Sequence, residues 1–260
     1  MASRKVLLEL RGDVAVITLN EPEILNAISL PLLDQLDEAI LEAAGRARAM
    51  MLTGAGRGFC SGVRLNGAPD SAGGAPDFGR ELETHLNPVM RRLRALPIPW
   101  ISAVRGPAVG AGCALALAGD LIVASDTAYF IQAFARVGLV PDGGSTHLLA
   151  RGTTRVRAME MMLLAEKTPA AQAVLWGLIN RVVPDDQLDA AALELATRLA
   201  TGPTRSYALI RDAAWRALDS AWEEALCLER KNQSLACATR DAAEGIAAFV
   251  EKRPAQFVGR

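Results

Sequence analysis

The residues best placed to do chemistry lie between Trp100 and Gly144. This stretch opens with a short apolar run, Trp100 to Val104, whose length and flanking proline are typical of a buried strand. The glycine-rich residues 106–112 follow and lead into the helix-like sequence CALALAG. The first N–H groups of a helix have no acceptor within the helix, so they can bind an anionic oxygen. We therefore expect an oxyanion site here, with the carboxylate of Asp142 near the end of the same stretch.

A second glycine-rich loop precedes this stretch. Residues Ala49 to Thr53 are predicted to form a buried strand that runs into residues 54–62, GAGRGFCSG. Four glycines in this loop let the backbone approach another backbone or a ligand closely. The two loops together are the candidate binding site.

Composition limits the class of protein. The chain has 260 residues, of which 51% are hydrophobic and 22% are charged, so it is globular and can bury a large core. A net charge of −1 gives no electrostatic reason to expect nucleic acid or an anionic membrane surface as a partner. The four cysteines form no C-x-x-C pair, and neither a signal peptide nor an apolar run of membrane-spanning length is recognised. We expect a cytoplasmic protein with no membrane partner.

The elements that must position the two loops alternate between strands and helices. The hairpin predicted around Gly12 joins Val6–Leu10 to Val14–Leu19, and Ser29 is predicted to cap a helix. Residues 66–79 are interpreted as a mobile surface loop, and residues 80–96 as a helix that bends or restarts at Pro88. The remaining predictions are strands at 121–124, 128–131 and 178–183, and helices that open at 142–144 and after Thr168-Pro169.

Beyond Gln187 the sequence predicts only amphipathic helices, with breaks at Gly202-Pro203 and Asp219-Ser220. These helices are rich in large apolar residues: Leu209, Ile210, Trp215, Trp222, Leu226 and Leu228. Either an ordinary core within the chain or an interface between subunits would bury them, and the sequence leaves both open.

Four motifs in a fixed order resemble those of the crotonase, or enoyl-CoA hydratase/isomerase, superfamily. They are N-E-P-x-x-L-N-A at 20–27, F-C-S-G-V-R-L at 59–65 with G-P-A-V-G-A-G-C-A-L-A-L-A-G-D at 106–120, W-G-L-I-N-R-V-V at 176–183, and E-G-I-A-A-F-V-E-K-R-P-A-Q-F at 244–257. The resemblance covers nearly the whole chain. It implies an α/β fold, a spiral of β-β-α units over residues 1–190 that holds an acyl-CoA site, followed by a helical oligomerisation region at 191–260. A homotrimer or a dimer of trimers is the implied assembly.

The resemblance also implies the roles of individual residues. In the family, two backbone N–H groups hold the thioester oxygen of an acyl-CoA, and by position these belong to Val63 and Ala111. The substrate or CoA is then expected to contact further residues of the same motifs and of the segment before Asp142: Leu25, Ala27, Ser61, Gly62, Arg64, Leu65, Val109, Gly110, Phe134 and Val137.

Two departures from the family pattern bear on the reaction. Hydratases of the family carry two glutamates that position and activate water, and this chain has Ala114 and Phe134 at those places. Residues 133–142 instead match the A-F-x-x-x-G-L-I-P-D pattern of the ring-opening isomerase type of the phenylacetate pathway (epoxyphenylacetyl-CoA isomerase), in which an acid stands at the place of Asp142. From its position alone Asp142 could equally be an N-cap for the next helix.

The resulting expectation is a cofactor-independent acyl-CoA isomerase in which Asp142 moves a proton through a thioester enolate. An enoyl-CoA hydratase and a non-catalytic acyl-CoA binder are the alternatives. Arg64 replaces the usual Asp of the family, and it either pairs elsewhere on the surface or contacts a CoA phosphate. Neither histidine, His85 or His147, has a partner at metal-ligand spacing, so no metal is expected.

Overall fold

The computed structural model describes residues 4–64 and 77–260. Leu65, and with it most of the segment interpreted as a mobile loop, lies outside the described residues. The segment's last three residues do not form part of a loop, because Asp77 caps α2 (Phe78–Glu81) through a hydrogen bond from Arg80 N–H.

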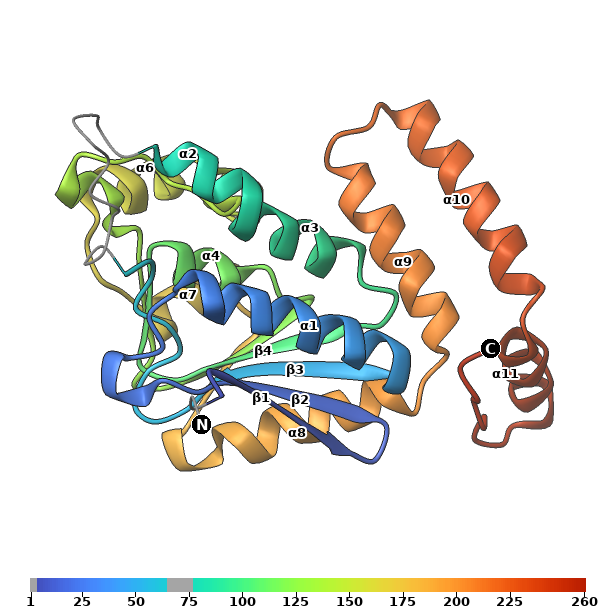
Figure 1. Cartoon of the computed structure of the whole chain (residues 1–260). Helices are drawn as coiled ribbons and strands as arrows, with labels where there is room; N and C mark the ends of the chain where they lie inside the picture. The colour runs from blue at the N-terminus through green and yellow to red at the C-terminus, as the bar shows by residue number, and fades with distance from the viewer. Residues whose placement is uncertain (1–3, 65–76) are drawn as a thin grey trace.

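A large sheet forms the centre of the molecule (Figure 1). Its strand order is β1 (Val6–Arg11), β2 (Val14–Leu19), β3 (Ala49–Gly54), β4 (Trp100–Val104), β6 (Leu121–Ser125) and β9 (Arg181–Val183). In this sheet β1 and β2 pair antiparallel, as the predicted hairpin requires, whereas the other described strand pairs are parallel. Gly12 takes the left-handed turn position with φ +61°. The parallel strands are almost continuously apolar because helices cover both faces of the sheet.

A small second sheet holds the glycine-rich loops together. It consists of β5 (Pro107–Val109), β7 (Tyr129–Ile131) and β8 (Thr168–Pro169). Isolated bridges pair Cys60 with Ala108 and Ile28 with Val63, which extends the pairing toward the start of the chain. Each turn of the chain therefore adds one strand to the large sheet and then a short extended segment beside the small one. This arrangement confirms the expected spiral.

Helices α1 (Leu30–Arg46) and α3 (Asn87–Ala95) cover one face of the large sheet, and α8 (Leu188–Ala200) covers the other (Figure 1). Ser29 is the N-cap residue of α1 but makes no side-chain capping bond. Pro88 lies within a helical run that continues from Phe78 to Ala95, directly after the π-helical segment η2 (Leu82–Leu86). The wider π-helical turn is where the run accommodates a residue that lacks an N–H. Because α8 packs on the sheet, the predicted boundary after residue 190 would cut a helix of the core.

The connections near the cavity are short helices. They are η1 (Pro22–Ile24), α4 (Ala111–Leu117), η3 (Ala133–Val137), α5 (Ser145–Gly152), α6 (Arg155–Leu164), α7 (Ala170–Leu175) and η4 (Asp185–Gln187). The helix predicted from residue 142 begins at Ser145, and the strand predicted over 178–183 is confined to its last three residues.

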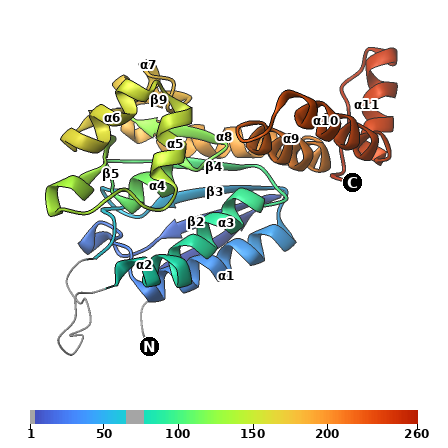
Figure 2. The same ribbon diagram turned by 90° about the horizontal axis from the view of Figure 1, so that it is seen from above.

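Helices α9 (Thr204–Ala217), α10 (Trp222–Cys237) and α11 (Arg240–Glu251) project away from the sheet (Figures 1 and 2). The predicted breaks at Gly202-Pro203 and Asp219-Ser220 are confirmed, since they separate α8 from α9 and α9 from α10. Arg211 anchors α9 to the core, since its Nε lies 2.6 Å from Asp120 Oδ2 and its Nη2 donates to the Leu93 carbonyl over 2.9 Å. The buried guanidinium thus satisfies groups of the core that would otherwise lack partners.

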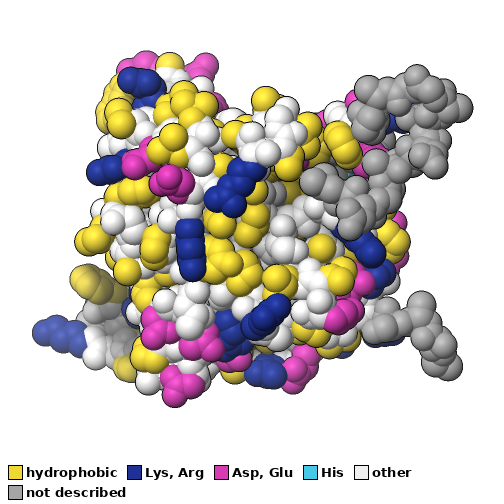
Figure 3. All heavy atoms as spheres, turned by 90° about the vertical axis from the view of Figure 1, so that its left-hand side faces the viewer, with side chains coloured by type: hydrophobic (Ala, Val, Ile, Leu, Met, Phe, Trp, Pro, Cys, Tyr) yellow, Lys and Arg dark blue, Asp and Glu magenta, His cyan; other side chains and the backbone are white. Residues whose placement is uncertain are grey.

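Large apolar side chains on these projecting helices remain exposed. Ile210 is 61% exposed and Trp222 is 73% exposed, and on α11 Phe249 reaches 85%. An intrachain core therefore does not account for all of the apolar residues that the sequence places here. Exposed apolar residues also occur on the face of the molecule that carries α6, including Val156 and Leu163 (Figure 3). No helix within the described residues has the length and apolarity needed to cross a membrane.

Candidate active site

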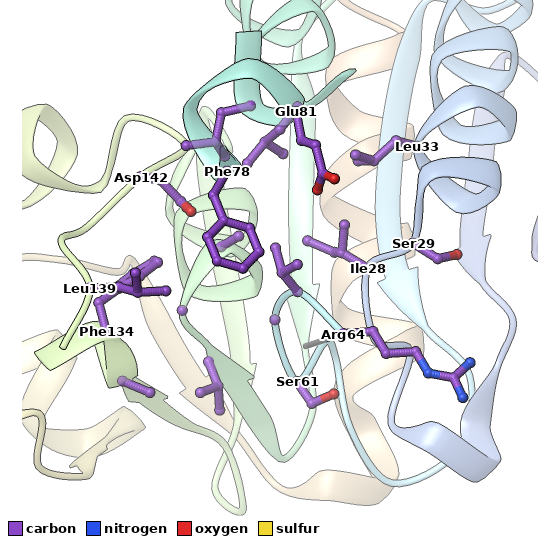
Figure 4. Close-up of a pocket in the computed structure, with 18 of the residues that line it drawn as sticks. Ile28, Ser29, Leu33, Ser61, Arg64, Phe78, Glu81, Phe134, Leu139 and Asp142 are labelled. Carbon is purple, nitrogen blue, oxygen red and sulfur yellow. The ribbon is translucent and has the colours of Figure 1, made fainter. Parts of the chain in front are cut away.

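A cavity of about 480 Å³ opens between the two glycine-rich loops, α1, α2 and the segment that ends at Asp142 (Figure 4). Ten of the residues predicted to form the site line it: Ser61, Gly62, Val63, Arg64, Val109, Gly110, Ala111, Phe134, Val137 and Asp142. These residues come from three distant parts of the chain, so the spiral brings the predicted motifs together. A cavity of this size suits a small organic group.

The two loops are held against each other by backbone hydrogen bonds. Cys60 N–H donates to Pro107 O over 3.0 Å, and Val109 N–H donates to Cys60 O over 2.9 Å. Glycine is required at Gly112, where an added Cβ would lie 2.6 Å from Cys60 O. At Gly62, whose φ is +90°, an added Cβ would lie 2.7 Å from Val109 O. The glycines thus permit the close approach that the sequence indicates.

The N–H group of Val63 is left unused by the pairing around it. In the bridge to Ile28, the Ile28 N–H donates to Gly62 O over 2.8 Å and the Arg64 N–H donates to Ile28 O over 3.0 Å. Val63 lies between these two bonded groups, and its own N–H has no acceptor within residues 4–64 and 77–260. A backbone donor at a cavity wall is available to a ligand oxygen.

Ala111 provides a comparable donor at the start of α4. The N–H groups of Cys113 and Ala114 both reach Gly110 O, over 2.9 and 3.2 Å, whereas Ala111 is the first helical residue and its N–H has no acceptor in the described chain. An added Cβ at Gly62 would be 3.8 Å from Ala111 N, so the two loops meet here. Both predicted oxyanion donors therefore border the same cavity.

Asp142 contributes a carboxylate to the same cavity (Figure 4). Its Oδ1 is buried and has no hydrogen-bond partner among the described residues, and burial raises the pKa of this carboxyl from 3.8 to about 6. The N-cap of α5 is Gly144, and Asp142 hydrogen-bonds to that helix through its backbone carbonyl, which accepts from Ser145 N–H over 2.9 Å. The N-cap interpretation of Asp142 is therefore wrong.

The two positions at which hydratases carry glutamates have apolar surroundings. Ala114 is fully buried and does not line the cavity, and an added Cβ at Gly143 would lie 3.1 Å from its Cβ. Phe134 does line the cavity, with its ring 3.6 Å from the place where a Cβ on Gly110 would stand. The wall beside the two N–H donors is consequently hydrocarbon, and Asp142 is the acidic group on it.

Two predicted contact residues, Leu25 and Ala27, do not line the cavity. Leu25 O accepts a hydrogen bond from Ser61 N–H over 2.9 Å and so supports the first loop from behind, and Ala27 is buried. Leu65 lies outside the described residues. Arg64 is exposed at the mouth, where its guanidinium points away from the interior (Figure 4).

Sequence reasoning missed the helical side of the cavity. Its lining also includes residues of α1 and the chain before it, of the helical run that starts with α2, and of the η3 region: Ile28, Ser29, Leu30, Leu33, Phe78, Glu81, Leu82, Leu86, Ala133 and Leu139. Phe78, Glu81 and Leu82 have the i, i+3, i+4 spacing of one helix face, a signal that the predicted loop over 66–79 interrupts.

The other reactive side chains lie apart from this chemistry. Burial raises the pKa of Cys60 and of Cys113 to about 12, so neither thiol ionises near neutral pH. His147 stacks on Trp215 with ring centroids 6.3 Å apart. In the described parts of the chain, no group of three or more His, Cys, Asp or Glu side chains is arranged to hold a metal ion.

Comparison with known proteins agrees with this geometry. The enoyl-CoA hydratase/isomerase family matches residues 9–260. The chain is 44% identical over 258 residues to 1,2-epoxyphenylacetyl-CoA isomerase of Escherichia coli, covering 98% of each protein. It is 39% identical to a probable enoyl-CoA hydratase of Rhodobacter capsulatus over the full length of both. The crystal structure of an enoyl-CoA hydratase from Polaromonas sp. JS666 superposes with a TM-score of 0.91 at 31% identity, covering 97% of this chain and 99% of that one. The chain therefore belongs to the enoyl-CoA hydratase/isomerase, or crotonase, family.

Proposed function

We propose that the protein is a cofactor-independent isomerase that moves a proton on an unsaturated acyl-CoA through a thioester enolate. The observation that carries the proposal is the carboxylate of Asp142. It faces the cavity with one oxygen unpartnered, and the Val63 and Ala111 N–H groups border the same cavity without acceptors in the described chain. An acid/base beside a pair of oxyanion donors is what a proton shift next to a thioester requires.

The two backbone N–H groups and the Asp142 carboxylate have different tasks in the proposed reaction. The N–H groups of Val63 and Ala111 bind the thioester oxygen and stabilise the negative charge that develops there. Asp142 accepts a proton from the carbon next to the thioester, and the C–H electron pair forms the enolate. The protonated Asp142 then returns a proton to a carbon further along the conjugated system. No water is consumed, which fits a wall in which Ala114 and Phe134 replace the two glutamates of the hydratases.

Water addition is the competing reaction, because several relatives, including the one from Rhodobacter capsulatus, are named probable enoyl-CoA hydratases. Hydration needs groups that orient and activate a water molecule at the double bond. Asp142 is the acidic group on the wall beside the donors, so a water on that wall would meet one carboxylate where the family's hydratases have two. A third candidate is a binder without catalysis, which would not need a carboxyl of raised pKa facing the acyl site.

The test is to incubate the protein with a 3-enoyl-CoA and, separately, with a 2-enoyl-CoA. We expect the absorbance of the conjugated thioester to rise with the first substrate and no loss of it by hydration with the second. Faster hydration than isomerisation would favour the hydratase. Binding of both thioesters without turnover would favour the non-catalytic binder.

We also propose that the chain assembles as a homotrimer or a dimer of trimers through its C-terminal helices. The exposed Ile210, Trp222 and Phe249 on these helices support this, because apolar area of this kind is ordinarily buried in an interface. Light scattering after gel filtration is expected to give three or six times the chain mass of 27.6 kDa at micromolar concentration. A monomer would contradict the proposal.

A further inference from the structure

A second carboxylate, that of Glu81, reaches into the cavity from the wall opposite Asp142 (Figure 4). The two acids come from different elements, since Glu81 ends α2 and Asp142 precedes α5. The ring of Phe78 projects between them (Figure 4). The mechanism proposed above uses Asp142 alone, so it leaves Glu81 without a role.

Among the described residues, the carboxylate of Glu81 has no polar partner. Its carboxylate forms no hydrogen bond or ion pair with any residue of 4–64 and 77–260, and residues 1–3 and 65–76 contain no Lys, Arg or His. Arg64 is the cationic residue of the cavity lining, and its guanidinium points away from the interior (Figure 4). The neighbouring lining is hydrocarbon, including Ile28, Leu33 and Leu82.

Glu81 is half-buried, so a ligand that fills the cavity takes its carboxylate out of water, at a cost in binding free energy unless the ligand binds to it. A carboxylate beside apolar surface loses part of its hydration, and a ligand that fills the cavity removes more. A ligand with a hydrogen-bond donor at this point recovers that loss, whereas a purely hydrocarbon ligand does not. A ligand with a carboxylate there would add repulsion between like charges.

We propose that Glu81 determines substrate specificity by accepting a hydrogen bond from a hydroxyl group on the acyl portion of the thioester. The preferred substrates are then hydroxylated unsaturated acyl-CoAs, ahead of plain alkenyl ones and well ahead of those that carry a second carboxylate. This inference rests on the proposed function, because the acyl group occupies the cavity only if the thioester oxygen is bound by Val63 and Ala111. A hydroxyl fits better than an ammonium group, whose remaining donors would face hydrocarbon without acceptors.

The experiment measures binding, so it does not depend on turnover. Dissociation constants are determined by calorimetry for saturated acyl-CoAs and for their ω-hydroxy counterparts over a series of chain lengths. The proteins compared are the parent, Glu81→Leu, Glu81→Gln and the control Glu83→Gln. Glu83 is a suitable control because it lies close by in the sequence, is exposed and pairs with Arg91 over 2.9 Å.

We expect the parent to bind the best ω-hydroxy ligand about tenfold or more tightly than its plain counterpart, the ratio typical of a hydrogen bond to a charged group. Glu81→Leu is expected to abolish or reverse this preference, because no acceptor then faces the hydroxyl group. Glu81→Gln, whose amide oxygen still accepts, should retain part of the preference and should bind a dicarboxylic acyl-CoA better than the parent does. Glu83→Gln should behave as the parent.

The assignment would be overturned if the ratio of the dissociation constants for the plain and the ω-hydroxy acyl-CoA were the same in the parent and in Glu81→Leu at every chain length. A collapse of the plain substrate's turnover in both Glu81 variants would also overturn it, because Glu81 would then belong to the proton-transfer step. If the parent isomerises no thioester yet shows the hydroxyl preference, the proposed function fails and the binding role of Glu81 stands.

Discussion

Replacing Asp142 by Asn is expected to slow isomerisation of a 3-enoyl-CoA by about 10²–10⁴-fold, the usual contribution of a positioned acid/base. Asparagine keeps the size of the side chain and cannot take up a proton. The measurement is kcat for conjugation, compared with the parent and with Asp186→Asn, an exposed aspartate in η4 far from the motif residues in the sequence. A variant that isomerises at the parent rate would remove Asp142 from the mechanism.

The same substitution has a predictable effect on stability. Because burial raises the folded-state pKa of Asp142 from 3.8 to about 6, the folded protein holds its proton more tightly than the unfolded chain does. The parent therefore loses unfolding free energy relative to Asp142→Asn as the pH rises from about 4 to about 6, and the difference is constant above that window. Two pKa units correspond to about 3 kcal/mol at most, and partial exposure of the group makes the real effect smaller. Denaturation in urea at pH 4 and pH 7 measures this difference.

The activity of the parent should follow the same ionisation. A base must be deprotonated in the free enzyme, so kcat/KM is expected to rise with pH through about 6 and then to level off. A profile that is flat between pH 5 and 8 would indicate that another group accepts the proton.

Replacing Ala111 by Pro is expected to reduce kcat by about 10²–10³-fold or more, because it removes one of two oxyanion donors. Proline is tolerated at the first position of a helix, which Ala111 occupies in α4. The preceding Gly110 has ψ −126°, outside the helical region that a following proline disfavours. In the variant, the proline ring would take the place of the amide hydrogen beside Gly62, so it would also narrow the space for the thioester oxygen.

The matched control is Arg155→Pro, which places proline at the first residue of the exposed helix α6. Thermal unfolding and circular dichroism of both variants show whether the fold survives. If folded Ala111→Pro keeps the parent kcat, the Ala111 N–H does not bind the thioester oxygen. Substituting Val63 by another apolar residue should have little effect, since its contribution comes from the backbone.

The glycine-rich loops and the positions of the large-sheet strands along the chain were predictable because local sequence determines them. Gly62 and Gly112 occur where any Cβ would collide with Val109 O or Cys60 O, and such positions are visible as glycines in the sequence. The N-cap interpretation of Asp142 failed for a different reason. Two glycines after it move the helix start to Ser145, and a residue's type does not reveal which of several adjacent positions becomes the cap.

The helical wall of the cavity could not be predicted because tertiary packing creates it. Glu81 and Leu82 face the acyl site only because α2 and η2 lie over loops that are distant in the sequence. Leu25 and Ala27 illustrate the converse. They belong to a recognisable motif, yet neither lines the cavity: Leu25 O accepts the Ser61 N–H behind the first loop, and Ala27 is buried.

The backbone supplies the N–H donors, whereas side chains form the cavity wall, and this difference affects how mutation can change the substrate range of the protein. In the proposed mechanism, thioester activation rests on two peptide N–H groups that almost any residue except proline supplies. The shape and polarity of the acyl wall rest on Phe78, Glu81 and Leu82, which occupy one short helical run. Mutations in that run can therefore alter the accepted acyl group while the thioester site is inherited intact. A library randomised at these three positions should yield variants with new substrate ranges from a few substitutions, without repair of the chemistry.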